Sequence, residues 1–110
     1  MAYDEQLAGR IRAALAQRDA DAGERKMFGG IAFMVRGNMC AGVIGDDLMV
    51  RLGEDGADAA LDEPHVRPMD FTGRPMRSMA YVAPAGTADD AALAAWIDRC
   101  LAFNATLPAK

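Results

Sequence analysis

The chain has 110 residues, 52% of them hydrophobic, and a formal net charge of −4. This length fits one domain, 1–110, and the acidic balance argues against direct nucleic-acid binding, which requires a basic face. No apolar run approaches the ~20 residues of a membrane span, so we expect no membrane contact. The acidic start after Met1 is unlike a signal or transit segment, which predicts a cytoplasmic protein.

The first predicted element is an amphipathic helix over residues 4–17. Leu7, Ile11 and Leu15 recur at helical spacing along it, which predicts one buried side. Asp4 precedes the helix and is a suitable acceptor for the free N–H groups of the first turn. Residues 19–23 break the pattern and are expected to form a loop.

An apolar run over residues 26–44 follows, which we interpret as a short strand, a glycine break and a hairpin. Gly37-Asn38 suits a two-residue turn, because both residues tolerate positive φ. This register pairs Phe33 with Gly42, whose bare backbone leaves room for the ring. It predicts two apolar faces. The face expected beneath helices holds Ile31, Phe33, Val35, Cys40 and Ile44, and the other holds Ala32, Met34, Met39, Ala41 and Val43.

The second half of the chain predicts two more strands, two helices and a long loop. A strand is expected over 48–52 and a short acidic helix over 53–63, stopped by Pro64. Residues 65–75 are expected to be mostly loop, with a brief strand at 69–71, and the last strand covers 77–82. A capping box from Thr87 to Asp90 then opens a helix that runs to about Leu107. The fold class is therefore α+β, with about five strands.

Residues with catalytic or metal-binding chemistry are few. His65, the single histidine, lies between Pro64 and Val66 with no recognisable nucleophile nearby, so we expect an exposed loop residue. Cys40 and Cys100 lack metal-ligand spacing and are expected to be buried small hydrophobes rather than a disulfide or redox pair. Phe28-Gly29-Gly30 lacks the lysine of a phosphate loop. We therefore expect no enzyme, no metal and no cofactor.

Binding through an apolar surface is the function that the pattern favours. Met34 and Met39 flank the hairpin turn on the face without an assigned cover, and flexible methionine suits adaptable contacts. Trp96 and Phe103 are further interface candidates at the border of the final helix. These residues predict a homodimer or another protein partner.

An alternative is a small-molecule or nucleotide site for an anion. Arg67, Arg74 and Arg77, together with Lys26, form the basic set that could bind carboxylate or phosphate groups. The acidic segment just before them also offers ordinary salt-bridge partners. Both interpretations stay open at this point.

Five segments, in order, carry a family resemblance: KMFGGIAF at 26–33, GNM at 37–39, DDLMVR at 46–51, PMDFTGRPM at 68–76 and AALAAW at 91–96. In these segments, which span nearly the whole chain, the protein resembles the TfoX/Sxy N-terminal domain family. The resemblance implies a curved antiparallel sheet with N- and C-terminal helices packed on it, similar to type III secretion chaperones and other dimer-forming folds. The namesakes regulate competence for DNA uptake and carry a second, helical domain. The resemblance therefore implies a stand-alone binding or regulatory domain, and it supplies no catalytic residues.

Overall fold

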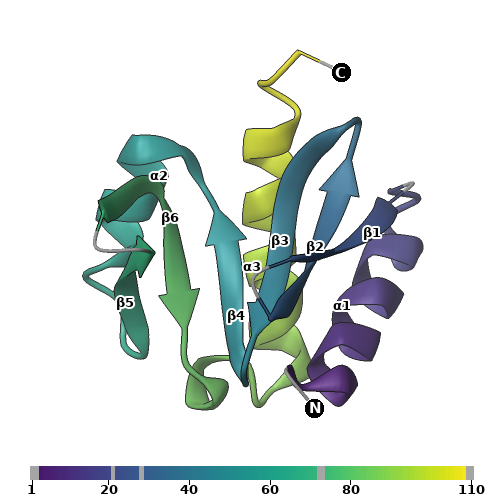
Figure 1. Ribbon diagram of the computed structural model, residues 1–110, viewed down its shortest axis with the longest axis horizontal. Helices are drawn as coiled ribbons and strands as arrows, with labels where there is room; N and C mark the ends of the chain where they lie inside the picture. The colour runs from purple at the N-terminus through teal and green to yellow at the C-terminus, as the bar shows by residue number, and fades with distance from the viewer. Residues whose placement is uncertain (1–2, 21, 28, 72–73, 109–110) are drawn as a thin grey trace.

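The computed structural model describes residues 3–20, 22–27, 29–71 and 74–108, with side chains except at 27, 69–71 and 74–77. The fold is α+β, as predicted, with six antiparallel strands in the order β1-β2-β3-β4-β6-β5 (Figure 1). The elements are α1 (Glu5–Gln17), β1 (Ala22–Met27), β2 (Gly30–Val35), β3 (Asn38–Ile44), β4 (Asp47–Arg51), α2 (Gly53–Ala60), β5 (Val66–Phe71), β6 (Arg74–Val82) and α3 (Asp90–Asn104). The expectation of about five strands was too low, because β1 and β5 extend into segments predicted as loops.

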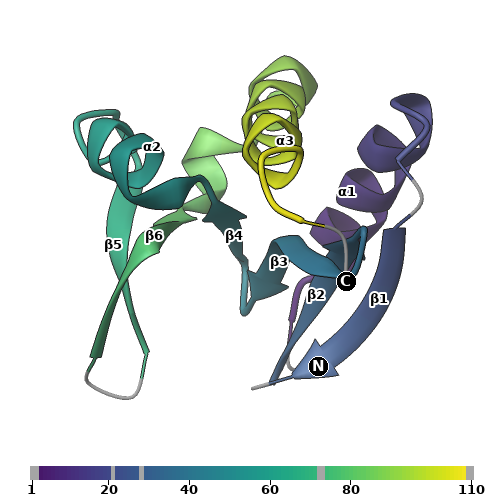
Figure 2. The same ribbon diagram turned by 90° about the horizontal axis from the view of Figure 1, so that it is seen from above.

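The three α-helices of the described residues lie on one side of the sheet. Figure 2 shows them in a row, with both outer hairpins of the sheet bending away from them. One core cluster joins the helices to the sheet, and its largest fully buried side chains include Phe33, Ile11, Leu15, Leu48 and Ile97. The opposite side carries no helix among the described residues, and we call it the helix-free face. Figure 1 looks onto this face.

The helix ends follow local capping chemistry. Asp4 caps α1 as predicted, and its Oδ1 accepts from the backbone N–H of Gln6 at 2.9 Å and of Leu7 at 3.1 Å. The predicted capping box was wrong, because Asp89 rather than Thr87 caps α3, through a 3.0 Å bond from the Ala91 N–H. Thr87 donates instead to the Pro84 carbonyl of a short 3₁₀ turn.

The predicted hairpin turn was wrong by one residue. Arg36 and Gly37 occupy the turn, with φ of 56° and 81°, so Val35 pairs with Asn38. Positive φ at both positions is the signature of the primed turn, and Arg36 adopts it instead of Asn38. Asn38 is 4% exposed, and its Nδ2 donates to the Pro108 carbonyl at 2.9 Å. That contact with the end of the described chain holds Asn38 in β3.

A β-bulge shifts the register a second time. Met34 pairs with Met39 and Phe33 with Ala41, so Cys40 has no partner on β2. Ile31, Phe33, Val35 and Cys40 join the helix-side core as predicted. Three of the ten assignments were wrong: Ala41 and Val43 also face the helices, and Ile44 packs on the opposite face.

Gly42 does not lie beneath Phe33. It pairs with Ala32 on one side and Met49 on the other, on the helix-free face. A Cβ at this position would lie 2.5 Å from the Met49 methyl carbon and 2.6 Å from the Ile31 carbonyl oxygen. The absent side chain therefore makes room for Met49.

Candidate functional site

A row of paired residues crosses the helix-free face from one edge of the sheet to the other. Directly opposed residues in antiparallel strands share a face, so the register fixes the row. It begins at β1 and ends at β5, and consists of Arg25, Ala32, Gly42, Met49, Tyr81 and Arg67. Small and apolar residues occupy its middle, and an arginine stands at each end.

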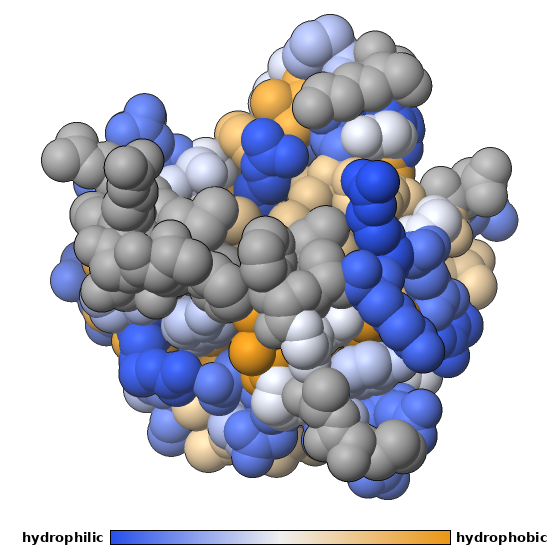
Figure 3. Space-filling model, viewed as in Figure 1, coloured by the Kyte–Doolittle hydropathy of each residue, from blue (hydrophilic) through white to orange (hydrophobic). Residues whose placement is uncertain are grey.

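Four methionines, Ile44 and Tyr81 lie on this same face, and two of these six residues, Met49 and Tyr81, belong to the row itself. Met49 and Met79 are buried, and Met39, Ile44 and Tyr81 pack against them. Met34 is Met39's partner across the hairpin, and both are half-buried. Figure 3 shows this side of the molecule, with orange and tan atoms at the centre among blue atoms and atoms drawn in grey. We call these six residues the methionine face: Met34, Met39, Ile44, Met49, Met79 and Tyr81.

The predicted interface residues separate into two locations. Met34 and Met39 lie together on the methionine face. Trp96, in contrast, is 7% exposed and belongs to the helix-side core, with the Arg99 guanidinium carbon 4.2 Å from its ring centroid. Phe103 is half-buried on α3 and fills the space beside Gly53. The two aromatic candidates are therefore not part of the methionine face.

The predicted anion-binding residues are not gathered by the described structure. Lys26 lies on β1 and Arg67 on β5, the two opposite edges of the sheet. Arg67 already binds Asp47 through a 2.8 Å ion pair and lies 5.1 Å from the Tyr81 ring centroid. The side chains of Arg74 and Arg77 fall outside the described part of the structure. An anion site built from this set remains a prediction.

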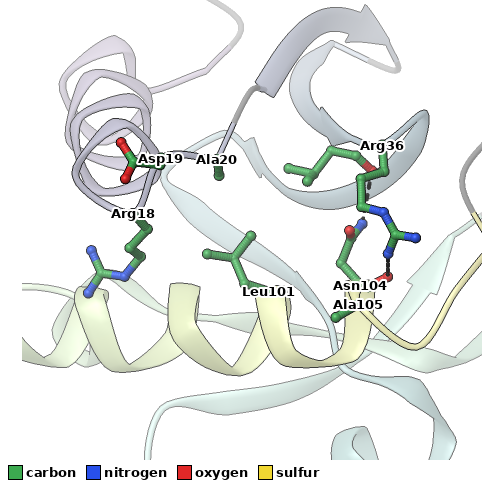
Figure 4. A pocket seen from close by; sticks show the side chains of 8 residues that line it. Arg18, Asp19, Ala20, Arg36, Leu101, Asn104 and Ala105 are labelled. Carbon is green, nitrogen blue, oxygen red and sulfur yellow. Dashed lines mark hydrogen bonds between the residues drawn. The ribbon is translucent and has the colours of Figure 1, made fainter.

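A pocket of about 540 Å³ lies on the helix side, where α1, α3 and the β2–β3 turn meet. Figure 4 shows Leu101 between two polar ends, with Arg18 at one and Arg36 and Asn104 at the other. Asn104 is 2% exposed and donates through Nδ2 to the Val35 carbonyl at 3.1 Å, and Arg36 donates to the Asn104 carbonyl at 3.1 Å. The hydrogen bonds of Arg36 and Asn104 therefore hold the end of α3 against the hairpin, and Leu101 forms the apolar part of the pocket between them and Arg18.

Sequence reasoning missed Asn104, although a signal was present. Asn104 follows Ile97 and Cys100 along the buried side of α3, so it is a polar residue within an apolar stripe. A buried amide requires hydrogen-bond partners. The Val35 carbonyl is the partner that this residue finds.

The two cysteines are buried, as predicted, but the structure also brings them into contact. Cys40 is 1% exposed and Cys100 is 0% exposed, and both are free thiols. A hydrogen bond from the Cys100 side chain holds the pKa of Cys40 below its ordinary value, although burial opposes this. The same bond, together with burial, raises the pKa of Cys100. No spacing rule could have found this pair, because it depends on α3 crossing the bulge of β3.

His65 and possible metal ligands are the remaining chemical candidates. His65 is an exposed turn residue with φ of 70°, in agreement with the prediction of a loop position. Within the described residues, no three potential metal ligands lie close together. None of the described helices has the length and apolarity that a membrane crossing requires.

Comparison with known proteins agrees with this architecture. The family model for the TfoX N-terminal domain matches residues 6–104, from α1 to the end of α3. No curated protein and no solved structure matches the chain. The match covers nearly the whole sequence and all of the elements described above, and the chain therefore belongs to the TfoX N-terminal domain family.

Proposed function

We propose that this domain is a non-catalytic, regulatory binding module that contacts another protein through the methionine face. The observation that carries the proposal is the uneven cover of the sheet, since three helices pack on one side and none of the described helices on the other. Methionine side chains are flexible and polarizable, so they adapt to a partner's shape. Family membership supports a binding or regulatory role in general terms.

The charges on this face favour a partner that combines apolar and acidic side chains. Arg25 is exposed on edge strand β1 and forms no ion pair with a described residue, and Arg67 stands at the other end of the row. A carboxylate that meets Arg25 would gain a charge-assisted hydrogen bond. A second copy of the chain would instead place these arginines near one another, so we favour a different protein over the homodimer expected from sequence.

The test uses one variant on each side of the sheet. Met39→Asp places a charge on the methionine face, and Leu61→Asp is the matched control, since Leu61 is 38% exposed and lies after α2. Proteins captured from the native host are identified, purified and titrated against both variants by calorimetry. We expect a partner that binds the wild type and Leu61→Asp equally and binds Met39→Asp at least about ten-fold more weakly.

Light scattering of the purified protein completes the experiment. A monomer at high concentration agrees with a different partner. A dimer that Met39→Asp dissociates would replace that partner with a second copy. Equal binding by both variants would contradict the methionine face as the contact surface.

A further inference from the structure

The pocket on the helix side has two polar ends joined by an apolar middle. Its volume of about 540 Å³ is in the range of small-molecule sites, roughly 300–1,000 Å³. Figure 4 shows Arg18 and Asp19 together at the α1 end, and Arg36 with Asn104 at the hairpin end. The half-buried Leu101 lies between them. A ligand in this pocket would therefore combine an apolar part with a polar group at one end.

The two ends differ in charge. The Arg18 guanidinium is already neutralised by an ion pair with Asp98, and the exposed Asp19 adds a negative charge beside it. Arg36, in contrast, is exposed and forms no ion pair with a described residue. An anionic group is therefore repelled at the α1 end and attracted at the hairpin end.

The position of Arg36 is fixed by its backbone and by one hydrogen bond. Its φ of 56° is uncommon for a residue other than glycine, and places it in the turn before Gly37. Its Nη1 donates to the Asn104 carbonyl at 3.1 Å, which uses one of the five N–H groups of a guanidinium. The remaining N–H groups can bind both oxygens of a carboxylate.

Asn104 supplies an acceptor at the same end of the pocket. It is 2% exposed, and its Nδ2 donates to the Val35 carbonyl, whereas no described residue donates to its Oδ1. Among the described residues, no sealed side-chain oxygen lacks a partner, so the Oδ1 is reachable from outside, and Asn104 lines the pocket. A buried amide oxygen is most stable with a donor. A ligand at this end is therefore expected to carry a donor beside its anionic group.

We propose that this pocket binds an α-carboxylate flanked by an N–H group and an apolar side chain. The carboxylate lies against the Arg36 guanidinium, the N–H donates to the Asn104 Oδ1, and the apolar side chain packs on Leu101. A free apolar amino acid and the last residue of a peptide share this chemistry. The pocket and the methionine face lie on opposite sides of the sheet, so the two proposals are independent of each other.

Titrations followed by heteronuclear NMR test the proposal on the wild-type protein. The probes are N-acetyl-L-leucine, which ends as a peptide does, free L-leucine, and N-acetyl-L-leucinamide, whose neutral amide replaces the carboxylate. We expect both acids at millimolar concentration to cause saturable shifts of the backbone signals of Arg36, Leu101 and Asn104. The amide should bind at least about ten-fold more weakly than N-acetyl-L-leucine, because the charge-assisted bond is lost.

The two acids also distinguish the sources of the ligand. Tighter binding of N-acetyl-L-leucine supports a peptide C-terminus, and tighter binding of L-leucine supports a free amino acid. The absence of saturable shifts with both acids, or equal binding of N-acetyl-L-leucine and its amide, would overturn the proposal.

The donor is tested with isocaproate and its α-hydroxy derivative, which differ only in one hydroxyl at the position of the N–H. The hydroxy acid should bind at least about three-fold more tightly, because its hydroxyl donates to the Asn104 Oδ1. Equal binding of the two acids would overturn the role assigned to Asn104.

Two arginine variants locate the carboxylate. Arg36→Gln removes the charge and should weaken binding of N-acetyl-L-leucine at least about ten-fold. Arg12→Gln is the matched control, because Arg12 is an exposed arginine of α1 that does not line the pocket, and it should bind as the wild type does. Equal affinities of the two variants would overturn the assignment of Arg36. Thermal melting confirms that Arg36→Gln is folded, and the comparison of acid and amide on the wild type decides the carboxylate without it.

Discussion

The two faces of the sheet differ in how their apolar side chains are buried. On the helix side, Phe33, Ile97 and their neighbours fill one continuous core built by all three helices. On the helix-free face, the buried hydrophobic cluster consists of the two methionines Met49 and Met79, held among half-buried neighbours. Close packing between rigid elements specifies one arrangement, whereas methionine accepts several. This difference in packing is the basis for proposing the methionine face as the contact surface.

The largest expected effect compares truncation on the two faces. Phe33→Ala removes a fully buried ring from the helix side and should lower the free energy of unfolding by about 3–5 kcal/mol. Met34→Ala, the neighbouring residue on the other face, should cost less than about 1 kcal/mol, because Met34 is only half-buried. Denaturant unfolding measures both values. Similar losses would show that the helix-free face is as firmly packed as the core.

A second prediction examines how closely the helix-free face is packed at its centre. Gly42→Ala places a Cβ against the Ile31 carbonyl and the Met49 methyl, and should cost about 1–3 kcal/mol. Gly23→Ala is the control, since a Cβ at that position of β1 has no neighbour within 4 Å. It should leave stability unchanged within about 1 kcal/mol. A neutral Gly42→Ala would show that Met49 moves aside freely.

A third prediction concerns the polar contact that fastens α3 to the hairpin. Asn104→Ala leaves the Val35 carbonyl without the 3.1 Å bond from Nδ2 and should cost about 1–3 kcal/mol. Thr106→Ala removes only an exposed hydroxyl that donates to the Phe103 carbonyl, and should cost less than about 1 kcal/mol. Thermal unfolding of the two variants gives the comparison. Equal costs would mean that the buried amide adds nothing beyond a surface contact.

The smallest expected effect is a pH dependence on the helix side. Arg12 donates two hydrogen bonds to Glu24, at 2.6 and 2.7 Å, and this holds the pKa of Glu24 below its ordinary value of 4.5. A lowered folded-state pKa stabilises the fold above the unfolded value, and this stabilisation is lost as pH falls through the folded value. At neutral pH, Glu24→Gln should lower the free energy of unfolding by less than about 1 kcal/mol. This difference from the wild type should shrink as the pH falls below 4.5.

Urea unfolding at several pH values measures this difference. Glu54→Gln is the control, because Glu54 is exposed and forms no ion pair with a described residue. A similar variation in both variants would exclude the Arg12 pair as the cause.

Sequence periodicity predicted the elements whose burial is one-sided. The apolar stripe and Asp4 defined α1 within one residue, and the start of α2 was predicted at residue 53, although α2 ends at Ala60 and not at the predicted residue 63. The edge strands were harder to predict from the sequence. Strand β1 contains Gly23, Glu24, Arg25 and Lys26, a composition that is also typical of loops. Charged side chains are common in edge strands because they prevent pairing with other chains.

The hairpin faces could not be predicted for a different reason. The turn and the bulge each moved the register, and both lie beside residues that are distant in sequence: Asn38 donates to the Pro108 carbonyl, and Cys40 lies in the core with Cys100. Met34 and Met39 could be identified as surface candidates because they are neighbours across the hairpin. The two thiols could not be paired from sequence, because they come together only when α3 packs on β3.

The bulge at Cys40 has a consequence for how this chain tolerates insertions and deletions. In a regular strand, residues 39 and 41 would point the same way, yet Met39 packs on the helix-free face and Ala41 in the core. The extra residue therefore reverses which alternate residues of β3 face the core on the two sides of the bulge. Loss or gain of one codon here would exchange interior for exterior along half of the strand, so length variation in this family should avoid this position and accumulate in the loops instead.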